Sequence, residues 1–349
     1  MVEAIAVGDL HLTDSKGKGG LAKYLDDDAD AFVLREFQKA CDYARKKHIK
    51  YVIQAGDVCD SPVMSQRATL LLIEFIKRNN DLTFFFISGN HDSISEDTSL
   101  GNSLEILQKV GFENAYFFTK PKSVKFGDSK IRFLPWPSED FDPEALNIYH
   151  KEVRGALNDG GRSFDDENLP VSQAVTVAGH LHTAHRIRNT WYIGTLYQTN
   201  FGEKPQKYFG HIRFNSAKDF DVELIPTTPE YTLHNVVIES REDLAQIPTD
   251  PKALVKLVIQ DGADVHTADY VGMPNIVQIK SFGTRADLRQ ALSEEFEGAE
   301  AVSFDPKDFL MAYMDAQGLD EGEQAAILEL QKKILEERLQ YNDDLLCSH

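Results

Sequence analysis

Three apolar runs near the N-terminus each end in glycine followed by polar residues, and this pattern most constrains the fold. The runs cover residues 3–7, 50–55 and 82–88, and they lead into Gly-Asp-Leu-His, Gly-Asp-Val-Cys-Asp and Gly-Asn-His-Asp. Segments 28–48 and 64–79 separate them and have helical spacing of apolar residues. This alternation predicts parallel strands joined by right-handed crossovers. In such sheets ligands bind beyond the carboxyl ends of the strands, where all three polar clusters stand.

The following segments add further strands. Residues 130–137 and 173–182 read as strands, and 188–195 and 208–214 are antiparallel candidates. Residues 144–150 fit either a strand or a helix.

A Pro/Thr-rich stretch near residue 225 indicates a linker. Beyond it we expect a small α+β domain, with strands and one helix, and then two amphipathic helices. The expected strands are 234–240, 253–260 and 275–282, and the expected helices are 285–298, 306–317 and 322–341. The predicted domains are therefore 1–224, 225–300 and 301–349.

The composition limits the classes of function. The chain has 37 basic and 56 acidic residues and a formal net charge of −19. A free-standing nucleic-acid binder normally carries a basic face, so a nucleic-acid function here needs metal ions, a local basic region or a partner.

The expected compartment is the cytoplasm, or the host cytoplasm for a viral chain. Cys41, Cys59 and Cys347 lie far apart, which fits a reducing compartment and argues against structural zinc. The apolar segments are too short to cross a membrane, and the N-terminus runs directly into a strand pattern.

The polar residues at the strand ends, together with one histidine between the third strand and Gly-His-Leu-His, include good ligands for divalent metals. These candidates are Asp9, His11, Asp57, Asn90, His150, His180 and His182. Mixed oxygen and imidazole donors suit manganese, iron or zinc better than calcium or magnesium. A carboxylate between two ions makes a two-metal clamp for phosphoryl displacement, and Asp57 is the natural bridge.

The Gly-Asn-His-Asp loop supplies different roles side by side. Asn90 offers a neutral oxygen to a metal, and His91 would face the substrate as proton donor or charge stabiliser. Asp92 would accept the other imidazole N–H and orient the His91 ring. Asp and Asn are also common turn residues after strands, which is the alternative interpretation of each residue taken alone.

The motifs together resemble the calcineurin-like metallophosphoesterase superfamily, because Gly-Asp, Gly-Asp, Gly-Asn-His-Asp and Gly-His-Leu-His occur in that order. Residues 134–140, LPWPSED, and 191–203, WYIGTLYQTNFGE, are similar to segments of the SbcD/Mre-eleven nucleases. The resemblance implies an α/β fold: a four-layer sandwich of two mixed sheets flanked by helices, with a small α+β cap domain and a C-terminal helical pair.

The resemblance also assigns the ligands. It implies that one metal is held by Asp9, His11 and His182. The other would be held by Asn90, His150 and His180, with Asp57 shared between them. Two manganese ions per chain are expected, with magnesium or another divalent metal as the alternative. The implied catalytic residues are His91 and its neighbour Asp92.

The implied function is a manganese-dependent DNA nuclease subunit in double-strand-break repair and recombination. It would act as an exonuclease on duplex ends and as an endonuclease on single-stranded or hairpin DNA. Its implied partners are DNA, a second copy of the chain, and an SbcC/Rad-fifty type coiled-coil ATPase bound through the C-terminal helices. Some relatives carry His where this chain has Asp60, which leaves the direction of cleavage open. The alternative is a small-molecule or cyclic-nucleotide metallophosphodiesterase.

Overall fold

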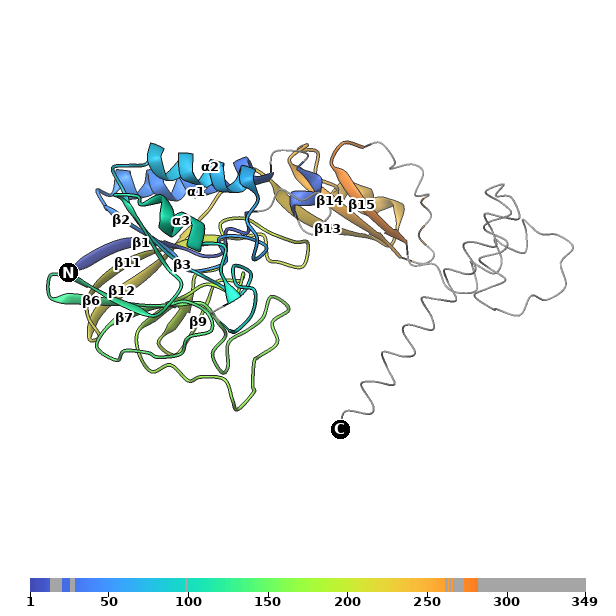
Figure 1. Cartoon of the computed structure of the whole chain (residues 1–349). Coiled ribbons are helices and arrows are strands. Elements are labelled where there is room, and N and C mark those ends of the chain that lie inside the picture. Colours follow the sequence, from blue (N-terminus) through green and yellow to red (C-terminus); the bar gives the residue numbers. More distant parts are fainter. Residues whose placement is uncertain are drawn as a thin grey trace, which may run out of the picture. The chain divides into compact units, whose positions relative to one another are not determined.

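The first sheet contains the predicted parallel strands and is extended at one edge by an antiparallel pair. The computed structural model describes residues 1–12, 21–25, 29–97, 100–260, 263, 265 and 273–281. Within them, a six-stranded sheet has the order β12-β11-β1-β2-β3-β4 (Figure 1). Its strands are β1 (Val2–Val7), β2 (Tyr51–Gln54), β3 (Thr83–Ile87), β4 (Ala115–Phe118), β11 (Tyr208–Ser216) and β12 (Asp219–Pro226). The first four are parallel, and β11 pairs antiparallel with β1.

Helices cover one face of this sheet. They are α1 (Ala29–Lys46), α2 (Gln66–Arg78) and α3 (Glu105–Val110), with a short 3₁₀ turn η1 (Leu21–Tyr24) before α1. Side chains alternate along β3, so Phe84 and Phe86 pack in the core beneath the helices. Phe37 of α1 stacks on Phe75 of α2 at 4.8 Å between ring centroids, which joins the two helices over the sheet.

The second sheet has the order β5-β6-β7-β8-β10-β9. Its strands are β5 (Lys122–Phe126), β6 (Ser129–Leu134), β7 (Leu146–Tyr149), β8 (Thr176–Ala178), β9 (His185–Ile187) and β10 (Thr190–Tyr192). The segment that fitted either a strand or a helix therefore forms β7, parallel to both β6 and β8. The candidate at 188–195 forms β10, which is antiparallel to β9 but parallel to β8.

The two sheets pack face to face through a shared apolar core. Ile53 and Phe85 point from the first sheet toward Phe133 and Ile148 of the second. The outer face of the second sheet is covered by residues 151–173, which form turns and short bridges. The predicted sandwich of two mixed sheets is confirmed.

A third sheet contains only parallel strands, in the order β13-β14-β15. We call it the cap sheet: β13 (Thr232–Ile238), β14 (Ala253–Ile259) and β15 (Ile276–Ser281), with η3 (Arg241–Gln246) between the first two. Its own core includes Val236, Ile238, Val255 and Leu257. The helices predicted at 285–298, 306–317 and 322–341 lie outside the described residues, and the predicted domain boundaries remain predictions.

None of the helices in the described part of the chain has the length and apolar content needed to cross a membrane.

Candidate metal centre

The predicted ligands gather at one edge of the sandwich because they follow strands whose carboxyl ends meet there. Asp9 and His11 follow β1, Asp57 follows β2 and Asn90 follows β3. In the second sheet, the remaining predicted ligands follow its two central strands: His150 after β7, and His180 and His182 after β8. The structure thus brings all the predicted ligands together from both sheets.

The glycines of the motifs are required by close approach. A Cβ atom on Gly56, whose φ is +96°, would lie 2.1 Å from Nδ1 of His150. A Cβ atom on Gly89 would lie 2.0 Å from Oδ1 of Asp57. Side chains at these positions would displace the donor atoms, so the glycines allow both sheets to contribute to one site.

Several predicted ligands also have unusual backbone conformations. Among the described residues that are not glycine, positive φ occurs at His11 (49°), Asp57 (53°) and His180 (77°), and also at His48 and Arg188. Such conformations cost free energy and are concentrated at functional sites, where the surrounding structure holds them in place.

Asp9, His11 and His182 are predicted ligands that lie together, and we call them the first ligand group. Nε2 of His182 lies 3.3 Å from Oδ2 of Asp9 and 3.1 Å from Nε2 of His11. Oδ2 of Asp9 is buried and has no hydrogen-bond partner among the described residues. The third distance, from Nε2 of His11 to Oδ2 of Asp9, is 3.9 Å, and donor atoms about 3–4 Å apart can surround one ion with bonds of about 2.1 Å. The unsatisfied carboxylate oxygen and the converging imidazoles therefore fit a divalent cation.

The predicted ligands Asn90, His150 and His180 also lie together, with Asp57 beside them, and we call these three the second ligand group. Oδ1 of Asn90 lies 3.2 Å from Nε2 of His150 and 3.0 Å from Nδ1 of His180. Oδ2 of Asp57 lies 3.2 Å from Nε2 of His150 and 4.0 Å from Nε2 of His11 in the first group. Asp57 is thus within reach of both groups, as a shared ligand requires.

The electrostatics favour a cation at this edge. Burial raises the pKa of Asp9 and of Asp57, but the neighbouring imidazoles, above all His150, outweigh burial and lower both pKa values. Burial lowers the pKa of His150, yet Asp57 and Asp9 together raise it to about 9. The buried carboxylates are therefore charged and create a negative potential that divalent metal ions would neutralise.

Each imidazole of His150, His180 and His182 uses its second ring nitrogen for an outer contact. Nδ1 of His150 lies 2.7 Å from the carbonyl oxygen of Ala55. Nε2 of His180 lies 3.2 Å from Oε2 of Glu152. Such acceptors fix the tautomer and leave the other nitrogen free to bind a metal.

The outer contact of His182 involves two further charged residues. Nδ1 of His182 lies 2.9 Å from Oε1 of Glu203, whose other oxygen pairs with Nζ of Lys207. Glu203 and Lys207 are both buried. Burial raises the pKa of Glu203, but His182 and Lys207 outweigh burial and lower it to about 2. The Glu203 carboxylate is thus charged and can accept a hydrogen bond from the imidazole N–H of His182.

Glu152 and Glu203 were not predicted from the sequence. Both lie in loops rather than directly after a glycine that ends a strand, so the sequence pattern that indicates the ligands does not include them. The signal that could have found Glu203 is its place at the end of the Phe-Gly-Glu segment that carries the family resemblance.

The structure corrects the expected partner of His91. Asp92 accepts hydrogen bonds from the backbone N–H groups of Val58 (3.1 Å), Cys59 (2.9 Å) and Gly89 (2.9 Å). Its carboxylate points into the protein, toward the loop after β2, and so ties that loop to the loop after β3.

His91 faces a different carboxylate. Its Nδ1 lies 3.4 Å from the carbonyl oxygen and 3.6 Å from Oδ1 of Asp60. The His91 side chain is 43% exposed, and its backbone N–H donates to Oδ1 of Asp57 at 2.9 Å. An exposed imidazole beside the Asp57 carboxylate suits a group that contacts substrate.

Comparison with known proteins gives one family. Residues 4–206 match the family model described as calcineurin-like phosphoesterase. Exonuclease subunit 1 of Enterobacteria phage T4 is 27% identical over 184 residues, covering 48% of this chain and 53% of that protein. The DNA double-strand break repair protein Mre11 of Saccharolobus solfataricus is 23% identical over 207 residues, covering 54% and 51%. Mre11 of Sulfolobus acidocaldarius is 26% identical over 194 residues, covering 51% and 50%. The chain spans about half the length of the curated relatives it matches.

Proposed function

The chain belongs to the calcineurin-like phosphoesterase family, and on that premise we propose that it is a two-metal nuclease that hydrolyses phosphodiester bonds of DNA. The observation that carries the proposal is the convergence of two ligand groups on Asp57, with His91 exposed beside it. The relatives named exonuclease subunit 1 and DNA double-strand break repair protein Mre11 support DNA as the substrate.

The residues have distinct tasks in this proposal. Asp9, His11 and His182 would hold one divalent ion, Asn90, His150 and His180 the other, and Asp57 would be shared. The oxygen and imidazole donors suit manganese, iron or zinc, and of these we propose manganese. Bound there, the ions would activate water and stabilise the attacking and leaving oxygens.

His91 would act directly on the substrate. With Nδ1 turned toward Asp60, Nε2 is the nitrogen available to donate a proton to the leaving oxygen or to stabilise its charge. Asp92 would act indirectly, because its hydrogen bonds to the backbone at Gly89 and Cys59 hold the loop that carries His91.

We further propose self-association through apolar side chains around α2 and α3. Leu70, Leu100, Ile106 and Val110 are all exposed hydrophobic residues, from 41% to 60%. Burying such side chains between two copies is favourable. Binding of an SbcC/Rad-fifty type ATPase through residues 301–349 is part of the same proposal, and those residues lie outside the described part of the chain.

One assay tests the proposed reaction. Purified full-length protein is incubated with manganese or magnesium and with linear duplex DNA, hairpin DNA or bis-p-nitrophenyl phosphate. We expect cleavage of duplex ends and hairpins with manganese. Hydrolysis of the small ester without cleavage of any DNA, even after addition of the ATPase, would overturn the nuclease and favour a small-molecule phosphodiesterase.

A further inference from the structure

The loop between β10 and β11, residues 193–207, contacts both chain segments that contribute to the first ligand group. Glu203 accepts from Nδ1 of His182. The hydroxyl of Tyr197, which is buried, donates to the carbonyl oxygen of Leu10 at 2.7 Å. Leu10 stands between Asp9 and His11, so the β10–β11 loop supports every chain segment that contributes to this group.

The same loop is hydrogen-bonded to the cap sheet. The side chain of Gln198 pairs with the backbone of Leu233 in β13: Oε1 accepts from the Leu233 N–H at 2.9 Å, and Nε2 donates to the Leu233 carbonyl at 3.1 Å. Asn235 of β13 donates to the carbonyl oxygen of Phe201. Gln198 is 2% exposed, so these bonds form away from water, where an unpaired partner is costly.

Gln198 also connects the two sides of the loop. Its Nε2 donates to the carbonyl oxygen of Glu203 at 3.2 Å. Glu203 is the residue whose side chain accepts from His182. One amide therefore contacts both the cap strand and the residue that orients a predicted metal ligand.

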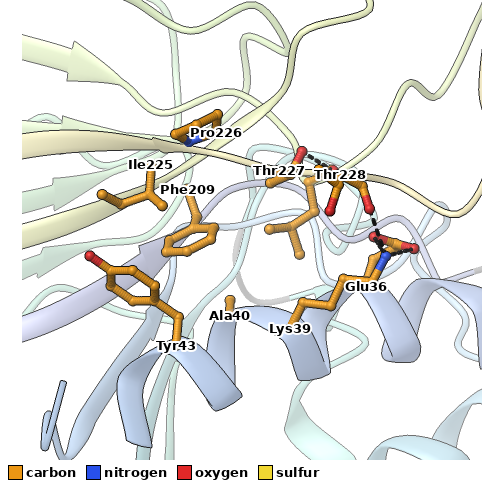
Figure 2. A pocket seen from close by; sticks show the side chains of 10 residues that line it. Glu36, Lys39, Ala40, Tyr43, Phe209, Ile225, Pro226, Thr227 and Thr228 are labelled. Atoms are coloured by element: carbon orange, nitrogen blue, oxygen red, sulfur yellow. Dashed lines mark hydrogen bonds and ion pairs between the residues drawn. The ribbon is translucent and has the colours of Figure 1, made fainter. Parts of the chain in front are cut away.

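The linker into the cap sheet contacts the same loop. Thr227 donates through its N–H to the carbonyl of Lys207 at 2.8 Å and through its hydroxyl to the carbonyl of Leu196 at 2.9 Å. Next to it, Nζ of Lys39 on α1 donates to the carbonyl of Thr228 at 2.9 Å, beside a cavity of about 180 Å³ between α1 and the linker (Figure 2). The linker is thus fixed to both the loop and α1.

The second ligand group is supported differently. The acceptors for its imidazoles are the carbonyl oxygen of Ala55 and the carboxylate of Glu152. In the described part of the chain, both belong to the metallophosphoesterase fold and precede the linker.

We propose that Gln198 is a positioning residue through which the cap sheet controls binding of the metal at Asp9, His11 and His182, and not at the other position. The inference rests on the proposed function, since it needs an ion at each position. Coupling between two sites is reciprocal, so metal binding must also stabilise the contact between Gln198 and β13.

The first experiment titrates the full-length wild type and Gln198→Met with Mn²⁺ by calorimetry. Methionine keeps the length of the side chain and loses every hydrogen bond. We expect two ions on the wild type and, on Gln198→Met, one ion weakened by roughly 10-fold, at the lower end of outer-contact effects.

A matched pair of variants identifies the affected ion. In His182→Ala, which removes a ligand of the first group, addition of Gln198→Met should leave the affinity of the remaining ion unchanged. Unchanged affinities for both ions in Gln198→Met, or further weakening in the His182→Ala background, would overturn the inference.

A second experiment needs no variant. Hydrogen exchange of the Leu233 amide is measured in wild-type protein with and without Mn²⁺. The proposal expects slower exchange with the metal, and equal rates would refute it even if Gln198→Met did not fold. A wild type that binds no Mn²⁺ would instead count against the proposed function.

Discussion

The two ligand groups use the same types of side chain, but His150 of the second and His182 of the first rely on different kinds of acceptor. In the second group, His150 is completely buried and its outer nitrogen faces a backbone carbonyl at the end of β2. In the first group, His182 depends on the side chain of Glu203 in the β10–β11 loop. Ala55, which carries that carbonyl, directly follows β2 and is hydrogen-bonded through its N–H to Val7 of β1, whereas a glutamate side chain must be held by further contacts.

Those further contacts are extensive. Glu203 pairs with the buried Nζ of Lys207 and accepts from Thr199 and Asn200 as well as from His182. A buried ion pair repays the loss of hydration only when its hydrogen bonds are complete. The position of His182 in the first group can therefore respond to changes elsewhere, whereas His150 in the second group is held by the backbone; His180 relies on one partly exposed glutamate, Glu152.

The largest expected effect comes from the residue common to both halves. Asp57→Ala should remove both ions, because Oδ2 of Asp57 lies near donors of each group. Losing several kcal/mol of stabilisation from each ion should lower hydrolysis of bis-p-nitrophenyl phosphate by roughly 10⁴-fold or more. Manganese content and hydrolysis are measured on the same preparation. One tightly bound ion in this variant would show that the carboxylate is not shared.

A smaller effect should follow from His91, which we propose contacts the substrate rather than either ion. His91→Asn should keep both ions and lower hydrolysis on the order of 10²–10⁴-fold, the usual contribution of a positioned acid. Calorimetry with Mn²⁺ and initial rates check the two parts separately. A missing ion in His91→Asn would make His91 a ligand and contradict its proposed contact with substrate.

Asp60→Asn is the companion variant. It keeps the backbone carbonyl that faces Nδ1 of His91 and removes the negative charge 3.6 Å away. Its effect on hydrolysis should be smaller than that of His91→Asn. Equal losses with both ions retained would mean that the carboxylate is as important as the imidazole. A weakened ion would instead implicate its contact with His11, whose Nδ1 lies 3.5 Å from Oδ1 of Asp60.

Most of the predicted ligands follow from a local signal in the sequence, whereas His150 was expected as the one histidine between the third strand and Gly-His-Leu-His. A strand that ends in glycine and then a donor places that donor at the sheet edge, as at Asp57 and Asn90. The parallel order of β1, β2 and β3 follows from the same alternation, and it is confirmed.

The outer contacts could not be read in this way. Asp92 is adjacent to His91 in sequence, yet its carboxylate turns toward backbone N–H groups of the neighbouring loop, while Asp60 faces His91 from a different strand end. Glu203 meets His182 only because the β10–β11 loop folds back on the sheet. Such contacts depend on loop paths, which composition and periodicity do not determine.

The next prediction compares the two outer carboxylates directly. Glu152→Gln and Glu203→Gln should each weaken one ion by about 10–100-fold, and not the same ion. Their stabilities should differ, because Glu203→Gln leaves the buried Lys207 without its counter-charge, which costs about 3–5 kcal/mol. Glu152→Gln should lower the free energy of unfolding by less, because Glu152 is only half-buried.

Mn²⁺ titration and urea denaturation measure these effects. Lys207→Met combined with Glu203→Gln is the control, since it removes both charges and should recover part of the lost stability. If both glutamate variants weakened the same ion, the division of the centre into two separately supported halves would be wrong.

The smallest effect concerns the charged contacts between α1 and the cap sheet. Oε2 of Glu230 lies 3.1 Å from Nε of Arg35 on α1, and Oε1 lies 2.9 Å from Nζ of Lys252, just before β14. The hydrogen bond from Lys252, aided by Arg35, lowers the pKa of Glu230 from its ordinary value of 4.5. Both ion pairs of Glu230 are partly exposed, so Glu230→Gln should lower the free energy of unfolding by only about 0.2–1 kcal/mol at pH 7.

The pH dependence of that difference has a defined sign. A carboxylate whose pKa is lower in the folded protein stabilises it fully above 4.5, and this contribution is lost as the pH falls through the lower, folded-state pKa. The gap between wild type and Glu230→Gln in urea denaturation should therefore close below pH 4.5, and it should shrink in 1 M salt. The matched control is Asp81→Asn, which removes another exposed ion pair of α1, the one between Asp81 and Arg45, without touching the cap sheet. Both Mn²⁺ affinities should stay unchanged in Glu230→Gln, because its carboxylate pairs with Arg35 and Lys252 rather than with the β10–β11 loop. A weakened ion in this variant would assign the coupling to the charged contacts of α1 instead of to Gln198.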